Sequence, residues 1–380
     1  MEKANSSRWI ISCSLLFGGL VYACLPANVV PIDDDFGYLR SVIKTIQHRR
    51  PWTDDWLEPW AASLSSTSAL LYVVFGNFYF ATYGLLAALA ATSFYFCAKL
   101  LERRTSLWFS LVTTTIALTF PTIFWKEIQF TGMAIYIPCL FGGLWAYDQK
   151  RWAQFLLFWS IAIGSRQSAI TWIALPLFAT FTATRTNRAH YADKAVWLPA
   201  VTAGAGAALF GLLALGMNKT HAQTVITDHL LDKFSLGSSA MICAIGVGII
   251  LVMAGLGTLF STLSSSEATR SIHFRQPVVR VILALLVVVV LAVDPRWRLL
   301  WEHTILSGTI GLLYLRTVAI LGLLGWMIQG TPRRIELVAC AAASLALLSI
   351  RGQPWDYYFF DVGAFALFSF EPENAFVDHL

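Results

Sequence analysis

The feature that most constrains this chain is a succession of long apolar segments, each bounded by charged residues or proline. A helix that crosses the hydrocarbon core of a bilayer needs about 20 apolar residues. Of the 380 residues, 57% are hydrophobic and only 13% are charged, which is about half the charged fraction of a soluble domain. So little charge cannot cover the surface of a soluble protein of this size. The chain is therefore predicted to be an all-α polytopic membrane protein, and the soluble, fibrous and disordered classes are excluded.

About twelve transmembrane helices are expected, and several of the segments are shorter than a full span. The expected segments are 9–25, 79–101, 106–123, 130–147, 152–165, 168–184, 195–217, 237–262, 277–293, 304–328, 334–350 and 356–371. No repeat or low-complexity linker divides the chain, so residues 1–380 are expected to form a single transmembrane domain.

Basic residues between the segments predict the orientation. Clusters such as Glu102-Arg103-Arg104 and Gln149-Lys150-Arg151 fall on one side if the segments alternate in direction, together with Lys3 and Arg8. Lysine and arginine in short loops mark the cytoplasmic side, so both termini are predicted to be cytoplasmic. The formal net charge of +5 is explained by these loops, and no nucleic-acid partner is expected.

The longest external segment is the first loop, residues 26–63. Within it, residues 36–48 place Tyr38, Val42 and Ile46 on one helical face and basic residues on another. This pattern is typical of a helix that lies in the plane of the membrane interface. We therefore predict a long external loop that carries interfacial helices and contacts membrane lipids.

Three adjacent carboxylates, Asp33, Asp34 and Asp35, lie in this loop and are candidate catalytic residues. Like charges this close repel one another, and one of these groups could act as a general base or hold an acceptor hydroxyl. The alternative is a solvated acidic turn that caps the helix beginning near Phe36.

Several cations on the same expected face are candidate anion-binding residues. Arg166 lies in a short external break, where it would pair with a phosphate or snorkel to the headgroups. Arg316 lies within an apolar segment, where an ionised arginine costs at least ~2.5 kcal/mol unless it faces protein, water or an anion. The Lys126–Glu127 pair is a further candidate, and its alternative is a surface ion pair. The remaining candidates on this face are Gln167, Arg296, Arg298, His303, Arg351, Trp52 and Trp56.

The order of these motifs resembles the GT-C superfamily, multi-span glycosyltransferases that use polyprenyl-phosphate-linked sugars. Asp34-Asp35-Phe36-Gly37-Tyr38 is similar to the family's acidic motif after the first span. Residues 166–172, RQSAITW, resemble a segment of the dolichol-pathway α-1,2-glucosyltransferase, and Pro121, Phe124 and Glu127 loosely echo its third-to-fourth-span segment. The family's Arg-Tyr-Leu-Leu-Pro segment lacks its arginine and proline here, and Arg351 is a candidate substitute.

The resemblance implies inverting sugar transfer from a polyprenyl-phosphate-sugar donor to a glycan, lipid or protein acceptor on the non-cytoplasmic side. It implies that one carboxylate of the triplet, for which Asp34 is the candidate, takes the acceptor proton, and that Asp35 or Glu127 orients the acceptor. The donor phosphate would lie against cations, and the acceptor would be bound by polar and aromatic residues of the loops. The first group comprises Arg166, Arg316, Arg296, Arg298 and Arg351, and the second Glu127, Lys126, Gln167, Tyr38, Trp52, Trp56 and His303.

Three alternatives remain open at this point. A transporter or flippase for a lipid-linked glycan would use the same buried arginines, although it usually has inverted repeats. A glycan polymerase, ligase or acyltransferase would keep the membrane site and change the chemistry. A non-catalytic assembly subunit would use neither the membrane site nor its chemistry. No cofactor is assigned; three carboxylates could hold a divalent cation, but no metal ligand is predicted.

Overall fold

A computed structural model describes residues 2–25, 35–51, 62–119, 123–124, 128–187, 194–215, 242–243, 246–247, 249–257, 259, 321–322, 334–351 and 360–369. Within these ranges every regular element is a helix, and no strand is present. The prediction of an all-α protein is therefore confirmed. The twelve-span arrangement stays a prediction.

Backbone contacts group the chain into two compact units, which are described separately. The first comprises Met1–Leu101 and Ser110–Ala222, and the second comprises Glu102–Phe109 and Gln223–Leu380. The single domain expected from the sequence stays a prediction.

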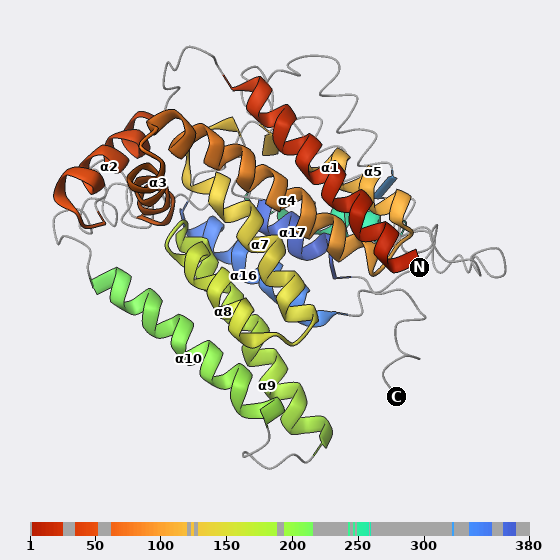
Figure 1. The fold of residues 1–380 in the computed structure, drawn as a ribbon. Coiled ribbons are helices and arrows are strands. Elements are labelled where there is room, and N and C mark those ends of the chain that lie inside the picture. The colour runs from red at the N-terminus through yellow and green to blue at the C-terminus, as the bar shows by residue number, and fades with distance from the viewer. Residues whose placement is uncertain are drawn as a thin grey trace. The chain divides into compact units, whose positions relative to one another are not determined.

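The first unit holds most of the described helices (Figure 1). Their bounds are α1 Glu2–Cys24, α2 Asp35–His48, α3 Ala62–Phe75, the π-helix η2 Phe80–Gly84, α4 Leu85–Glu102, α5 Leu107–Leu118, α7 Gly132–Asp148, α8 Trp152–Ile163, the 3₁₀ helix η3 Gln167–Ile173, α9 Ala174–Asn187 and α10 Lys194–Leu215. The apolar segments of the sequence coincide with these helices: 130–147 with α7 and 152–165 with α8, for example.

Helices α1 and α4 lie antiparallel and in close contact (Figure 1). At one end, Lys99 donates a hydrogen bond to Ser7 Oγ at 3.0 Å, and at the other the rings of Tyr22 and Tyr79 are 6.2 Å apart. Between them, Gly18 lies so close to α4 that a Cβ there would be 2.7 Å from the Ala87 carbonyl oxygen. Small residues allow this kind of backbone approach between membrane helices.

Helices α7, α8, η3 and α10 enclose an aromatic core. Trp159, Trp172 and Phe155 are fully buried, and the Trp159 indole N–H donates to the Ala169 carbonyl oxygen at 2.7 Å. A Cβ at Gly206 of α10 would overlap the Trp159 ring. Helix α10 can therefore pack against α8 only because residue 206 has no side chain.

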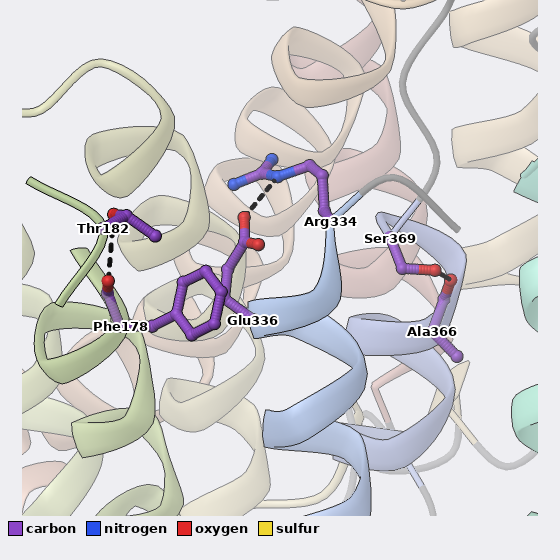
Figure 2. Close-up of polar contacts among 6 residues, drawn as sticks. All are labelled: Phe178, Thr182, Arg334, Glu336, Ala366 and Ser369. Carbon is purple, nitrogen blue, oxygen red and sulfur yellow. Dashed lines mark hydrogen bonds and ion pairs between the residues drawn. The ribbon is translucent and has the colours of Figure 1, made fainter. Parts of the chain in front are cut away.

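In α9, Thr182 Oγ1 donates to the Phe178 carbonyl oxygen within its own helix (Figure 2).

The second unit contains α16 (Ile335–Arg351) and α17 (Phe360–Leu367). The start of α16 is fastened to the end of α17, because the Arg334 backbone N–H donates to the Ser369 carbonyl oxygen at 3.0 Å. Arg334 also forms a nearly buried ion pair with Glu336, with Nε 2.9 Å from Oε1 (Figure 2). In the same unit, the Arg104 guanidinium lies 5.2 Å above the centre of the Phe368 ring. Cations are thus held by specific partners at this end of the two helices.

Two helical stretches in the described residues are long and apolar enough to cross a membrane, Ser6–Cys24 and Phe80–Glu102. A signal sequence or the buried core helix of a soluble protein can have the same length and apolar composition. Six further apolar helices are shorter: Ala62–Phe75, Leu107–Leu118, Trp152–Ile163, Ser168–Thr184, Val196–Leu212 and Glu336–Leu347.

Candidate functional site

Arg166 occupies the turn between α8 and η3. Its backbone is extended, with φ −155° and ψ 139°, while its N–H donates to the Ala162 carbonyl oxygen at 2.8 Å. Its own carbonyl oxygen accepts from the Ala169 N–H at 3.2 Å. The α-helix therefore stops at Ile163, and the chain restarts as a 3₁₀ helix. The extended residue Arg166 therefore separates two helices of different type.

The guanidinium of Arg166 is held against α7. It lies 5.5 Å above the centre of the Tyr136 ring and contacts the Met133 sulfur. The Tyr136 ring is fully buried, and its hydroxyl accepts a hydrogen bond from the Trp172 indole N–H at 3.1 Å. A cation over an aromatic face is attracted by the ring quadrupole, so the buried tyrosine stabilises the guanidinium in this position.

Tyr38, which lies on α2 of the first loop, reaches the same place. A Cβ built on Gly132, the first residue of α7, would be 3.2 Å from the Tyr38 hydroxyl and 2.7 Å from the Ser165 carbonyl oxygen. The Tyr38 side chain, the start of α7 and the residue that precedes Arg166 therefore meet at one glycine. These groups come from parts of the chain about 94 and 33 residues apart.

The other flank of the first loop is fastened to the same turn. At the start of α3, the Ser63 N–H donates to the Gly164 carbonyl oxygen at 2.9 Å, and Ser63 Oγ donates to the Ile161 carbonyl oxygen at 3.1 Å. A Cβ on Gly164 would overlap Ser63 Oγ. Tyr38, within the first loop, and Ser63, at the end of that loop, therefore both lie at the turn that carries Arg166.

The predicted site residues divide into three groups. Arg166 and Tyr38 are described in full and lie at the same turn, as set out above. Asp35, Gln167 and Arg351 are described by their backbones alone: Asp35 begins α2, Gln167 begins η3, and Arg351 ends α16 in the second unit. The candidates that lie outside the described residues are Asp33, Asp34, Trp52, Trp56, Lys126, Glu127, Arg296, Arg298, His303 and Arg316.

The sequence analysis did not single out Gly132 and Tyr136, which belong to this site. Thr131-Gly132 directly before an apolar run is a recognisable helix-start signal, because threonine favours the N-cap position. Tyr136 gave no signal of its own, since an aromatic residue in an apolar helix is most simply explained by core packing.

No protein-family model, curated protein or solved structure matches the chain. The resemblance to a glycosyltransferase family therefore depends on the motifs of the sequence, and the function is argued from this site.

Proposed function

We propose that the chain is a multi-span membrane glycosyltransferase of the GT-C type, which transfers a sugar from a polyprenyl-phosphate-linked donor to an acceptor on the non-cytoplasmic side with inversion. The observation that carries the proposal is the meeting of Arg166 and Tyr38 at the start of α7. An arginine with a fixed guanidinium is suited to bind a phosphate, and it lies beside the helix that begins within the carboxylate triplet.

The surfaces of the helices support a membrane setting. Leu16 of α1 is 74% exposed and Leu212 of α10 is 68% exposed, among many other large apolar side chains. On α1, large apolar side chains are exposed along most of the helix, from Trp9 to Tyr22, and such a surface is unusual for a helix in water. The Lys99–Ser7 contact brings together two ends with basic residues, which is the arrangement that the positive-inside rule favours for the cytoplasmic side.

The position of Asp35 on α2 supports a site that it shares with Tyr38. Asp35 begins α2 and precedes Tyr38 by three residues, which is about 4.5 Å along the helix axis at 1.5 Å per residue. Residues three apart lie on the same side of a helix. The start of α2 at Asp35 is therefore within roughly one turn of Tyr38, whose hydroxyl approaches Gly132.

The proposed reaction is a single displacement. The acceptor hydroxyl oxygen bonds to the anomeric carbon of the sugar while the bond from that carbon to the phosphate oxygen breaks. The bonding electron pair leaves with the polyprenyl phosphate, whose developing charge Arg166 stabilises. The acceptor proton passes to a carboxylate of the triplet, for which we propose Asp34. Because the site lies outside the cytoplasm in this proposal, a lipid-linked donor is favoured over a nucleotide sugar.

The test is sugar transfer by the purified chain in lipid vesicles, with a panel of labelled polyprenyl-phosphate hexoses and pentoses. Asp34→Asn should abolish transfer. Arg166→Lys should lower it by about 10- to 100-fold, because lysine keeps the charge but loses the planar, two-point phosphate contact and the stacking on Tyr136.

Arg103→Lys is the matched control, since Arg103 is exposed in the turn after α4, and it should transfer at the wild-type rate. Wild-type rates in both Asp34→Asn and Arg166→Lys would overturn the proposal. Movement of the lipid across the membrane without transfer would instead favour the flippase.

A further inference from the structure

The N-terminus of α7 has an unusual cap. Thr131 occupies the N-cap position with an extended backbone, φ −125° and ψ 165°, and its side chain makes no capping hydrogen bond. It is only 6% exposed, and within the described part of the chain its Oγ1 has no hydrogen-bond partner. A threonine at this position normally accepts a hydrogen bond from the first turn of its helix. A buried hydroxyl without a partner therefore lies at the end of a 17-residue helix.

Backbone N–H donors and a positive electrostatic potential are both found at the N-terminus of α7. The first N–H groups of a helix, here those of Gly132 and Met133, have no acceptor within the helix. The helix dipole adds about half a positive charge at this end. Gly132 has no side chain to cover its backbone, and the Tyr38 hydroxyl approaches to contact distance from the position that a Cβ would take.

A full positive charge lies beside this helix start, and a second unpartnered hydroxyl among the described residues follows it closely in the chain. The Arg166 guanidinium contacts Met133, the second residue of α7, and lies over Tyr136 one turn further on. Two residues beyond Arg166, the Ser168 Oγ is also buried, and no hydrogen-bond partner for it is found among the residues described. Helix N–H groups, hydroxyl donors and an arginine together are the groups that bind phosphate in proteins.

We propose that the first turn of α7 is a phosphate-binding site in which the Thr131 hydroxyl donates a hydrogen bond to a phosphate oxygen, beside Arg166 and the N–H groups of Gly132 and Met133. The identity of the phosphate as that of the lipid-linked donor rests on the proposed function, whereas the phosphate chemistry of the site does not. Thr131 then acts as a ligand-binding residue, and its hydroxyl is satisfied when the anion is bound.

The structure offers a matched control for this threonine. Thr114 of α5 is fully buried, and its Oγ1 is likewise without a hydrogen-bond partner among the described residues. Replacing either threonine with valine removes one unpartnered buried hydroxyl and keeps the shape of the side chain. Because an unpartnered buried hydroxyl destabilises the folded state, both variants should unfold at the wild-type temperature or above it.

The experiment measures binding of decyl phosphate and of inorganic phosphate to the purified full-length chain in nanodiscs by calorimetry, with decanol as the uncharged control. Thr131→Val should weaken decyl phosphate binding by about 10-fold or more, because a hydrogen bond to a charged group is lost. Thr114→Val should bind as the wild type does, and Thr131→Ser, which restores a hydroxyl, should recover most of the affinity.

Wild-type affinity in Thr131→Val, or no binding of either phosphate by the wild-type chain, would overturn the site. Equal affinity for inorganic and decyl phosphate would overturn the lipid as the source of the phosphate. If phosphate binding depends on Thr131 but the chain transfers no sugar, the proposed function is overturned and this site stands. Sugar transfer by Thr131→Val with the wild-type rate and donor KM would overturn this site and leave the proposed function standing.

Discussion

The indole N–H of Trp172 donates a hydrogen bond to the hydroxyl of Tyr136, and the two rings are tilted against each other with their centres 5.8 Å apart. Trp172 lies in the 3₁₀ helix η3 and Tyr136 lies in α7, so one hydrogen bond links the helix that follows Arg166 to the helix that its guanidinium contacts. Both side chains are almost completely buried. The position of the guanidinium over Tyr136 thus depends on a ring that is itself held by the tryptophan.

The first prediction concerns this hydrogen bond. Tyr136→Phe leaves the buried Trp172 N–H without its acceptor, while Trp172→Phe removes the donor together with packing area. A double-mutant cycle should give a favourable coupling of about 0.6–1 kcal/mol, the usual range for a hydrogen bond between helices in a membrane protein. The measurement is unfolding of the four proteins in detergent. Strictly additive losses would contradict the prediction and would mean that the bond does not stabilise the fold.

Gly132 is predicted to be essential for the convergence of α2, α7 and the Arg166 turn. Gly132→Ala places a methyl group 2.7 Å from the Ser165 carbonyl oxygen, so backbone must move, at a cost of about 1–3 kcal/mol. Gly204→Ala in α10 is the control, because a Cβ there meets nothing within 4 Å. It should leave the midpoint of thermal unfolding unchanged or raise it. A Gly132→Ala protein as stable as the control would show that the turn accommodates the methyl group.

Two adjacent glycines of α1 should differ in their response to the same substitution. A Cβ on Gly18 would be 2.7 Å from the Ala87 carbonyl oxygen and 2.9 Å from the Ala91 Cβ, whereas a Cβ on Gly19 meets nothing within 4 Å. Gly18→Val should therefore separate α1 from α4 and lower the unfolding temperature, and Gly19→Val should have little effect. Circular dichroism on heating measures both. Equal effects of the two valines would exclude the close packing of α1 on α4.

The helices of this protein could be located from the sequence, because apolar runs and helix formation share one cause. A run such as 130–147 became the helix Gly132–Asp148, and the amphipathic stretch 36–48 became Asp35–His48. In both cases burial of the apolar residues favours the helix, and the helix ends at the charged or small residues beside them.

The contacts of the site could be predicted only in part. Arg166 attracted attention as a charge in an apolar setting, yet its neighbours did not: Gly132 acts by having no side chain, and Tyr136 resembles any core aromatic residue. The switch from α-helix to 3₁₀ helix at Gln167 also left no clear pattern. Such features arise from tertiary packing between distant segments, on which local periodicity carries no information.

The last prediction tests the orientation of the chain with its own cysteines. Cys24 is exposed at the end of α1, while Cys97, near the Lys99 end of α4, is buried. If the N-terminus is cytoplasmic, a membrane-impermeant maleimide added to intact cells should label Cys24, because it lies at the opposite end of α1 from Ser7. Cys97 should be labelled only after denaturation.

The remaining exposed or half-buried thiols, Cys13 and Cys243, are replaced by serine so that they do not contribute. Cys24→Ser in the same background should abolish the signal. Labelling of Cys24 only after the cells are opened would reverse the orientation, and it would place the Arg166 turn on the cytoplasmic side, where a lipid-linked donor loses its advantage over a nucleotide sugar.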